Sequence, residues 1–535
     1  MERNTRGSDD RQNPSQLNTT EVEHADYPRD SKGMESGRFN RLKRFDRSKH
    51  AKFTKQRKPW FLQRILNEWF NRLLGAASDR SFSSQEEMYA ADRTSRDYIW
   101  NTVGVATWGM MFPLLTMVVT QLVGVEQAGM FSMAFVVGLL LMIVANYGVR
   151  TFQISDVEET HSFADYQINR IITCAIMVVV GLIYCAIRGY SEEMFTLSMG
   201  VYLYKMIDGL ADVYEGRLQQ VGKLYLAGIS QSVRSVLVLV IFSLCLLITR
   251  SLEISCIAMA VTAIISFIVL TLPLAFLESP KSRRFNTTAI QDLFKQCFPL
   301  FIAIFMFNLI DSMPKFVMEG MLTYDNQLYF NALYFPAQAI LLGMQLVYKP
   351  QILRMARLWS DAEKHKKFDL MMVVVIVGTI VLTAVGMLLM GTIGIPIMSF
   401  LYGINFEEFR ELCFVMMVAG GVTAGIDFLY QAITIMRKQQ AVTKLYLLTF
   451  GFSLFIPTLL IGFTGLPGAI LSYLIIMSIL FILLVTEYIS IRWNSRREMT
   501  ARVADSIERK RPSEMRAERE RLGQHRGGGM SKGDK

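Results

Sequence analysis

Three polar residues, Asn308, Asp311 and Lys315, interrupt a long apolar stretch at positions i, i+3 and i+7. In a helix this spacing puts the three side chains on one face, and Pro314 between them predicts a kink. A charge near the centre of a membrane helix costs about 2.5–3.5 kcal/mol on insertion scales, so such groups face a packed interior or a watery cavity. Asp311 and Lys315 therefore either neutralise one another or form a site that titrates or binds a cation.

Lys205, Asp208 and Asp212 repeat this spacing in an earlier apolar stretch. Lys205 stands three residues before Asp208, so the two can form an ion pair on one helical face. The same two interpretations apply here, mutual neutralisation or a titrating site. Asp427 adds an acidic candidate in a later stretch, and all five histidines lie outside the apolar stretches. The aspartates are therefore the candidates for ion coupling.

Several cations accompany these acids. Arg150 and Gln153 end the second apolar stretch, Arg217 follows the fourth, and Arg234 lies inside the fifth. Together with Lys205 they suit an anionic ligand such as a phosphate or an acidic sugar. For Arg150 and Arg217 the alternative is anchoring at the inner membrane surface, whereas Arg234 lies too deep in its stretch for that role. Further polar candidates within apolar stretches are Asn146, Asn331, Gln338 and Gln345.

The elements that must position these residues are transmembrane helices. The chain is 52% hydrophobic and 19% charged, and many apolar runs reach the roughly 20 residues that a helix needs to cross a bilayer. Only helices and closed barrels satisfy the backbone there. We predict an all-α polytopic fold with about twelve spans, over 98–123, 126–148, 166–188, 191–212, 223–249, 252–277, 289–313, 326–349, 368–392, 409–436, 440–463 and 465–491. Gly394, Pro396 and Gly403 interrupt the run that follows the ninth span.

The two ends of the chain are polar and basic. Residues 1–57 and 492–535 cannot bury a core, and we expect both to be disordered and cytoplasmic. Between them and the spans, residues 58–75 place apolar side chains every three to four positions, which predicts an amphipathic helix at the membrane interface. A docking helix for a partner protein is the alternative. The formal net charge of +10 suits anionic membrane lipids, and we expect no nucleic-acid partner.

Loop charge predicts the orientation. The loops 149–165, 213–222, 278–288, 350–367 and 437–439 and their edges are rich in Arg and Lys, whereas the alternate loops carry mostly Asp and Glu. The positive-inside rule puts the basic set in the cytoplasm. An even number of spans then leaves both termini in the cytoplasm, as expected for a multi-pass protein of the cell membrane.

The sequence also indicates an internal duplication. Lys223-Leu224-Tyr225-Leu226 opens the fifth span and Lys444-Leu445-Tyr446-Leu447 opens the eleventh; a Gln-Gln pair and an aspartate, Asp212 or Asp427, precede each. Because the copies are six spans apart, they lie on the same side of the membrane, and the repeats run parallel. We predict a six-helix lobe over 98–277 and a second over 289–491.

Motifs of soluble enzymes are missing from the sequence. It contains no GxxxxGK[ST], GxSxG or HExxH pattern, so nothing indicates an ATPase, a serine hydrolase or a zinc protease. Six cysteines lie in or beside apolar stretches without CxxC spacing, as small buried residues do. We expect neither a metal site nor a cofactor, and no catalytic residues.

With these residues in place, the chain resembles the polysaccharide-exporter branch of the multidrug/oligosaccharidyl-lipid/polysaccharide (MOP) flippase superfamily, the lipid-linked oligosaccharide flippases. The segment 147–156, Tyr-Gly-Val-Arg-Thr-Phe-Gln-Ile-Ser-Asp, is similar to the family's end of helix two, and 212–223 to its loop between helices four and five. Tyr348-Lys349-Pro350 and Gly394-Ile395-Pro396 also resemble family segments. The likeness covers about 95–490 and does not extend to the long N-terminal region.

The resemblance implies two lobes around a central cavity and alternating access. The substrate would be a lipid-linked oligosaccharide or polysaccharide repeat unit, flipped across the membrane with H⁺ or Na⁺ antiport as the driving force, beside proteins of glycan biosynthesis. On this basis Arg150, Arg217 and Arg234, with Gln153 and Lys205, are predicted to bind the anionic headgroup. Gating or ion coupling is predicted for a second set: Asn308, Asp311, Lys315, Asp208, Asp212 and Asp427.

Three other hypotheses stay open at this stage. The first is a cation-coupled exporter of small molecules or drugs from the same superfamily. The second is a membrane glycan polymerase or ligase, against which the short external loops count. The third is a scaffold for a biosynthetic complex that docks through 58–75.

Overall fold

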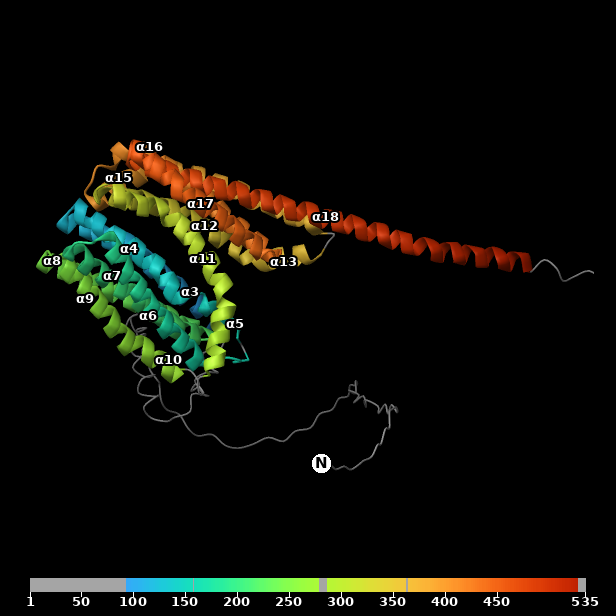
Figure 1. Cartoon of the computed structure of the whole chain (residues 1–535), viewed down its shortest axis with the longest axis horizontal. Helices are drawn as coiled ribbons and strands as arrows, with labels where there is room; N and C mark the ends of the chain where they lie inside the picture. The colour runs from blue at the N-terminus through green and yellow to red at the C-terminus, as the bar shows by residue number, and fades with distance from the viewer. Residues whose placement is uncertain (1–92, 157, 279–285, 362–363, 528–535) are drawn as a thin grey trace, which may run out of the picture. The chain divides into compact units, whose positions relative to one another are not determined.

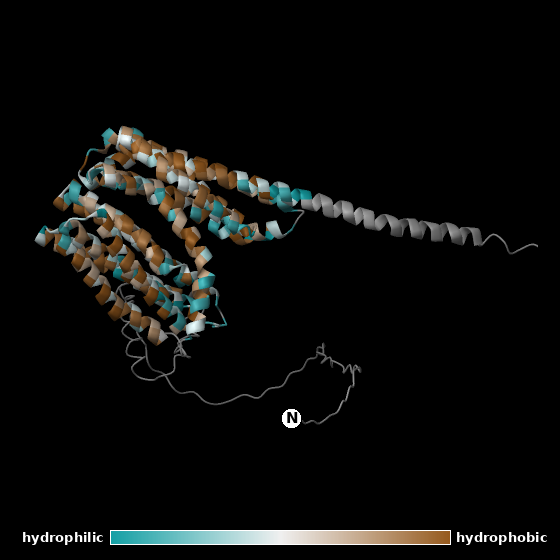
Figure 2. Ribbon diagram, in the orientation of Figure 1, coloured by the Kyte–Doolittle hydropathy of each residue, from teal (hydrophilic) through white to brown (hydrophobic). Residues whose placement is uncertain are grey.

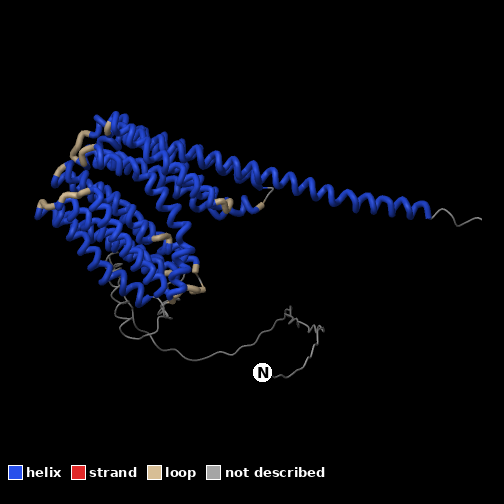
Figure 3. The backbone as a smooth tube through the Cα atoms, viewed as in Figure 1, coloured by secondary structure: helices blue, strands red, loops and turns tan. Residues whose placement is uncertain are grey.

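The computed structural model describes residues 93–156, 158–278, 286–361 and 364–527. The predicted extension 1–57 and the predicted amphipathic helix 58–75 lie outside this range. Within it, the chain is helical and contains no strand (Figure 3). The predicted all-α membrane fold is therefore confirmed.

The first lobe contains six membrane helices and one short connecting helix. Its elements are α3 (Arg93–Val123), α4 (Val125–Asn146), α5 (Val149–Ser155), α6 (Phe163–Arg188), α7 (Glu192–Gln220), α8 (Leu224–Thr249), and the continuous run α9 (Leu252–Ser266), η2 (Phe267–Thr271) and α10 (Leu272–Glu278). Serine side chains accept backbone N–H groups at the starts of α6, α7 and α9, from Ser162, Ser191 and Ser251, which satisfies orphan donors of those helices.

The second lobe repeats this order. It comprises α11 (Thr287–Met321), α12 (Asp325–Tyr348), η3 (Lys349–Gln351), α13 (Ile352–Ser360), α14 (His365–Leu389), η5 (Met390–Gly394), α15 (Ile395–Tyr402), η6 (Phe406–Phe409), α16 (Arg410–Ile435), α17 (Gln439–Thr464) and α18 (Leu466–Gly527). In Figure 1 the first group runs from blue to green and the second from yellow to red.

The two lobes share one packing scheme. In the first, α3 packs on α8, α4 and α6 pack on α7, and α9 packs on α7 and α8. In the second, α11 packs on α17, α12 and α14 pack on α16, and α18 packs on α16 and α17. Each helix thus has its counterpart six spans later, so the predicted parallel duplication is confirmed.

Close helix packing in both lobes depends on glycine. A Cβ atom at Gly228 of α8 would collide with the backbone carbonyl of Trp100 in α3. At a different crossing in the second lobe, a Cβ atom at Gly420 of α16 would lie 2.6 Å from the carbonyl oxygen of Ala337 in α12. Small residues at such crossings let helix backbones approach without a hydrophobic driving force from water.

Eleven helices or helix runs of the described region are long and apolar enough to cross a membrane. Hydrophobic residues run along the helices of both lobes (Figure 2). The twelfth helix, α7, fills the fourth predicted span, but its charged residues lower its hydropathy and are mostly buried among other helices. It also continues to Gln220, beyond the predicted end at 212. In this last part Glu215 pairs with Arg234 inside the lobe, and Arg217 pairs with Glu159 of the connection between α5 and α6.

Two further details differ from the predictions. Residues 492–527, expected to be disordered, continue α18 as a helix to Gly527; the segment is rich in Ala, Glu, Arg and Lys, which have high helix propensity. After the ninth span, the run interrupted by Gly394 stays helical through a π-turn at Met390–Gly394 and ends at Gly403, whose φ is 69°.

Candidate functional site

A buried charged cluster occupies the interior of the first lobe. Asp208 lies at its centre and accepts hydrogen bonds from Lys205 Nζ at 3.2 Å, Trp108 Nε1 at 3.0 Å and Arg234 Nε at 3.0 Å. Arg234 also donates to Glu215 Oε1 at 2.9 Å. Two cations therefore balance two carboxylates, which is the condition under which charges are retained in a low-dielectric interior.

Asp212 organises a second cluster one helical turn away. Its two carboxylate oxygens each accept a guanidinium N–H, from Arg150 at 2.7 Å and from Arg170 at 2.8 Å. Arg170 is fully buried and also donates to the carbonyl of Ala145 and to Asn146 Oδ1. Arg150 keeps 29% of its side chain exposed. Here two guanidinium groups face one carboxylate, so the cluster carries surplus positive charge.

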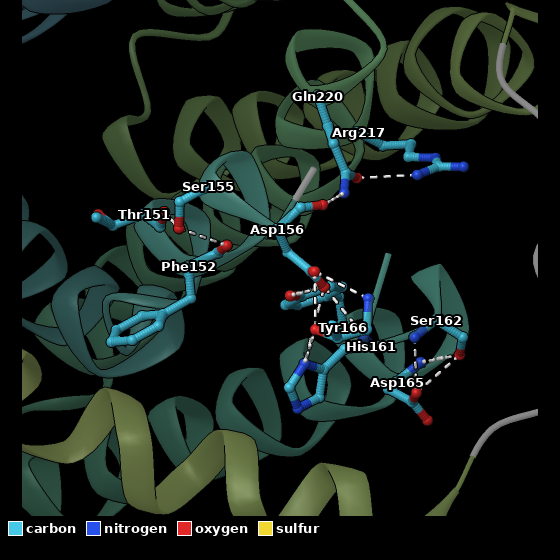
Figure 4. A network of polar contacts seen from close by, with 11 residues as sticks. Thr151, Phe152, Ser155, Asp156, His161, Ser162, Asp165, Tyr166, Arg217 and Gln220 are labelled. Carbon is cyan, nitrogen blue, oxygen red and sulfur yellow. Dashed lines mark hydrogen bonds and ion pairs between the residues drawn. The ribbon is translucent and has the colours of Figure 1, made fainter. Parts of the chain in front are cut away.

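Arg217 lies apart from both clusters, beside the connection between α5 and α6. Its guanidinium donates to Glu159 Oε1 at 2.7 Å. It also donates to Gln220 Oε1 at 2.9 Å, and Gln220 in turn donates to the carbonyl of Asp156 at 2.7 Å (Figure 4). Gln153, the remaining member of the predicted headgroup set, is buried and donates to the carbonyl of Val213 at 3.0 Å.

Asp156 fixes the same connection. Its carboxylate accepts the backbone N–H groups of Thr160 and His161, both at 2.9 Å, and the hydroxyl groups of Thr160 and Tyr166 (Figure 4). Burial raises the pKa of Asp156, but these hydrogen bonds to the charged form outweigh it and hold the pKa below its ordinary value.

In the second lobe, Asp311 is the centre of a polar site. Its two oxygens accept the hydroxyl groups of Tyr334 in α12 and Tyr473 in α18, each at 2.8 Å, and Lys315 Nζ lies 3.5 Å away. The Lys315 ammonium also lies 3.9 Å from the centroid of the Tyr334 ring. Asn308 does not join them, because its amide donates to the carbonyl of Ile304 in its own helix.

Asp427 is the counterpart of Asp212, since each lies eight residues before the end of its helix, α16 and α7 respectively. The partners differ. Asp427 accepts from the Gln345 amide at 3.0 Å and from the Tyr348 hydroxyl. Among the described residues, neither arginine of the Asp212 cluster has an equivalent here, so the second lobe holds a carboxylate with neutral partners where the first holds two cations.

One set of contacts between the lobes lies at the end of the bundle where α6 and α11 finish, which we call the joined end. Glu319 of α11 accepts from Arg188 at 2.7 Å and from the hydroxyl groups of Tyr184 and Tyr190. Its side chain is only 3% exposed. At the same end Gln121 of α3 donates to the carbonyl of Leu401. The first half of α11 also contacts the first lobe toward the opposite end, where Tyr147 stacks on Phe301 and the Asn286 N–H donates to Asp165.

The structure thus divides the predicted site residues. The local pairs Lys205–Asp208 and Asp311–Lys315 form as their spacing predicts, whereas the headgroup set is split among three places. Sequence reasoning did not identify the residues that complete these sites: Trp108, Arg170, Glu215, Glu319, Tyr334 and Tyr473. Arg170 and Glu215 could have been found as charges near span ends; the tyrosines carried no such signal. Among the described residues no group of three or more His, Cys, Asp or Glu side chains is placed to hold a metal ion.

Comparison with solved structures identifies the fold. The chain is similar to an outward-facing multidrug resistance MATE family transporter of the MOP superfamily, with a TM-score of 0.52, 12% identity, and coverage of 76% of this chain and 96% of that one. It is equally similar to a MOP superfamily transporter from Pyrococcus furiosus whose binding pocket is described as reversed in polarity (TM-score 0.51, 12% identity, 76% and 95% coverage).

At this identity the likeness shows the fold alone, an all-helical fold with many membrane-spanning helices. No protein-family model and no curated protein matches the chain. What the chain does has to be argued from the site.

Proposed function

We propose that this chain is a transporter that moves a lipid-linked oligosaccharide or polysaccharide repeat unit across the cell membrane by alternating access. The observation that carries the proposal is the positive surplus around Asp212. Arg150, Arg170, Lys205 and Arg234 stand against three carboxylates across the two adjoining clusters. A phosphate-linked glycan supplies the missing negative charge.

Arg150 is the group best placed to bind that charge. Its guanidinium is partly exposed, whereas Arg170 is fully buried on the far side of the same carboxylate. Arg150 Nη1 donates to Asp212 and Nη2 to Gln219 Oε1 at 3.0 Å. Both donors can turn to a phosphate while Arg170 keeps Asp212 neutralised. Guanidinium–phosphate pairs are bidentate and among the stronger polar contacts. Lys205 and Arg234 are fully paired in the interior, and they would contribute to the electrostatic potential near Arg150 without contacting the substrate.

The conformation fits an inward-facing step. With the orientation predicted from loop charge, the joined end faces outward, and the Asp212 cluster lies toward the cytoplasm with both chain termini. Contacts of Glu319 then close the outer side while substrate loads from within. Asp311 and Asp427, acids without a surplus of cations, are the groups that would bind H⁺ or Na⁺ during the return step.

A cation-coupled exporter of small molecules or drugs is the second candidate. It is favoured by Asp427, whose partners are neutral and which could attract a cationic ligand. The fold accommodates both choices, since one similar structure is described as a multidrug transporter and another as having a pocket of reversed polarity. The two candidates differ in the charge of the substrate. A flippase would hold an anionic headgroup at Arg150, and a drug exporter would hold a cationic ligand at Asp427.

Reconstitution distinguishes them. Liposomes that contain the purified chain would carry lipid-pyrophosphate-linked oligosaccharide in one leaflet. Its transfer to the other leaflet would be measured by the accessibility of the sugar to an added enzyme. We expect Arg150→Gln to slow transfer about tenfold, the value of one lost charged hydrogen bond. Arg354→Gln, an exposed arginine of α13, is the control and should transport normally. Equal rates for empty liposomes and wild type, with uptake of cationic dyes instead, would contradict the flippase proposal.

A further inference from the structure

Two turns at the end opposite the joined end have the same backbone conformation. One connects α7 to α8 through Val221, Gly222 and Lys223, and the other connects α16 to α17 at 436–438. In each turn the last residue donates its backbone N–H to the carbonyl five residues earlier. Lys223 N donates to Leu218 O at 2.7 Å, and Lys438 N donates to Ile433 O at 3.2 Å. Lys438, not Lys444, is therefore the structural counterpart of Lys223.

This register corrects the sequence alignment of the repeats. The Lys-Leu-Tyr-Leu motif that opens α8 recurs at Lys444, but Lys444 lies inside α17, which begins at Gln439. The two aspartates Asp212 and Asp427, in contrast, stay equivalent. The corrected register allows the two turns to be compared residue by residue.

The turns differ in whether a side chain accepts a backbone N–H at the start of the next helix. In the first lobe, Asp97 of α3 accepts the backbone N–H of Tyr225 at 2.8 Å, so a carboxylate from the chain fills the positive end of α8. The corresponding residue in the second lobe is Gln440. Among the described residues no side chain accepts its N–H, and a cavity of about 680 Å³ opens there.

The lining of this cavity is cationic. Arg437, Lys438 and Lys444 border it together with Gln440, and Glu487 is its single carboxylate. None of the three cations forms an ion pair within the described part of the chain. A helix start, an amide and three cations together make a site for an anion with several oxygen acceptors.

Arg437 has a backbone conformation that favours glycine. Its φ is 59°, in the left-handed region, where its counterpart Gly222 has a φ of 72°. A side chain other than glycine is strained there. The second lobe thus keeps an arginine at a position where glycine is the unstrained choice.

The membrane lies directly beside the cavity. Leu447 and Leu448 follow Lys444 by about one turn and are 64% and 51% exposed, as expected for side chains that contact lipid tails. We propose that the turn between α16 and α17 binds the phosphate of an anionic phospholipid headgroup, with the acyl chains along α17. The same chemistry would hold a soluble phosphate, so the test separates the two sources.

Native mass spectrometry of the purified full-length chain is the test. The protein would be equilibrated with equal amounts of phosphatidylglycerol and phosphatidylcholine, and lipid retention measured for wild type, Arg437→Gly, Lys444→Gln and Lys223→Gln. We expect wild type to retain phosphatidylglycerol preferentially, and Arg437→Gly and Lys444→Gln to lose about tenfold in that retention. Lys223→Gln removes the same charge from the sister turn, where Asp97 is in place, and should retain lipid as wild type does.

Arg437→Gly keeps the test interpretable, because glycine suits the conformation and its lipid-free Tm should equal or exceed that of wild type. Equal lipid retention by Arg437→Gly and Lys223→Gln would overturn the proposal. So would a Tm increase of wild type with inorganic phosphate, lost in Arg437→Gly, without selective lipid retention, since the ligand would then be soluble. Neither result depends on whether the chain transports a glycan.

Discussion

At the scale of single residues, the buried charges of the first lobe depend on one another. Arg234 is 1% exposed and bridges Asp208 and Glu215. Replacing it with Met leaves two buried carboxylates with Lys205 alone, and breaking such a buried pair costs about 3–5 kcal/mol. We expect a clear drop in Tm for Arg234→Met in detergent, and almost none for Arg354→Met on the surface of α13. A Tm drop no larger than that of the surface control would show that the cluster contributes little.

The role of Asp311 in transport is tested by Asp311→Asn, which removes the charge and keeps the size of the side chain. Asn at 311 can still accept one tyrosine hydroxyl, but it no longer neutralises Lys315 or binds a proton. Because the buried Lys315 loses its counterion, Asp311→Asn should also lower the Tm. If Asp311 gates or couples transport, export per folded molecule should nevertheless fall severely in this variant. Full export by this variant would remove Asp311 from the mechanism.

The sequence predicts the contacts that are local. Lys205 with Asp208 and Asp311 with Lys315 are pairs within one helix, and their spacing alone brings them together. Glu215 reaches Arg234 across the turn between two helices, and Tyr473 reaches Asp311 from the last membrane helix. Such partners depend on which helix faces lie together, and hydropathy does not contain that information.

At the scale of elements, Asp156 fixes the connection between α5 and α6. Because its pKa in the folded protein lies below the ordinary value, its stabilising effect is fully present above the unfolded pKa of about 4 and is lost as the pH falls through the folded value. Hydrogen exchange of peptides that span this connection should be faster in Asp156→Asn than in wild type at neutral pH. The Tm difference between the two should shrink as the pH falls below about 4. A difference that grows on acidification would contradict this assignment.

Glu319 joins α11 to α6 across the lobes. Its carboxylate is almost fully buried and accepts from one arginine and two tyrosines, so Glu319→Gln removes the charge that holds these donors. We expect faster hydrogen exchange in peptides at the ends of α6 and α11, and a shift toward a state in which the joined end is open. Glu193→Gln, an exposed residue in the first turn of α7, is the matched control. Unchanged exchange in Glu319→Gln would show that other contacts hold the lobes together.

At the scale of the whole molecule, hydropathy was sufficient to predict the helices, because the bilayer fixes the length and backbone bonding of each span, and the recurring Lys-Leu-Tyr-Leu motif indicated the duplication. They were not sufficient to set the register of the repeats. The recurring Lys-Leu-Tyr-Leu motif suggested one alignment, whereas the shared turn conformation of 221–223 and 436–438 shows another. Nor does the fold identify the substrate, since one similar structure at 12% identity is described as a multidrug resistance transporter and another as having a binding pocket whose reversed polarity suggests a different function.

The central claim, transport of a lipid-linked glycan, is tested most directly in cells from which the chain has been deleted. Surface glycan and lipid-linked precursor would be quantified together, with wild type and Arg150→Gln supplied in trans. We predict that deletion abolishes surface glycan while the lipid-linked precursor accumulates inside, that wild type restores both, and that Arg150→Gln restores them poorly. Normal surface glycan without precursor accumulation in the deletion strain would contradict the account.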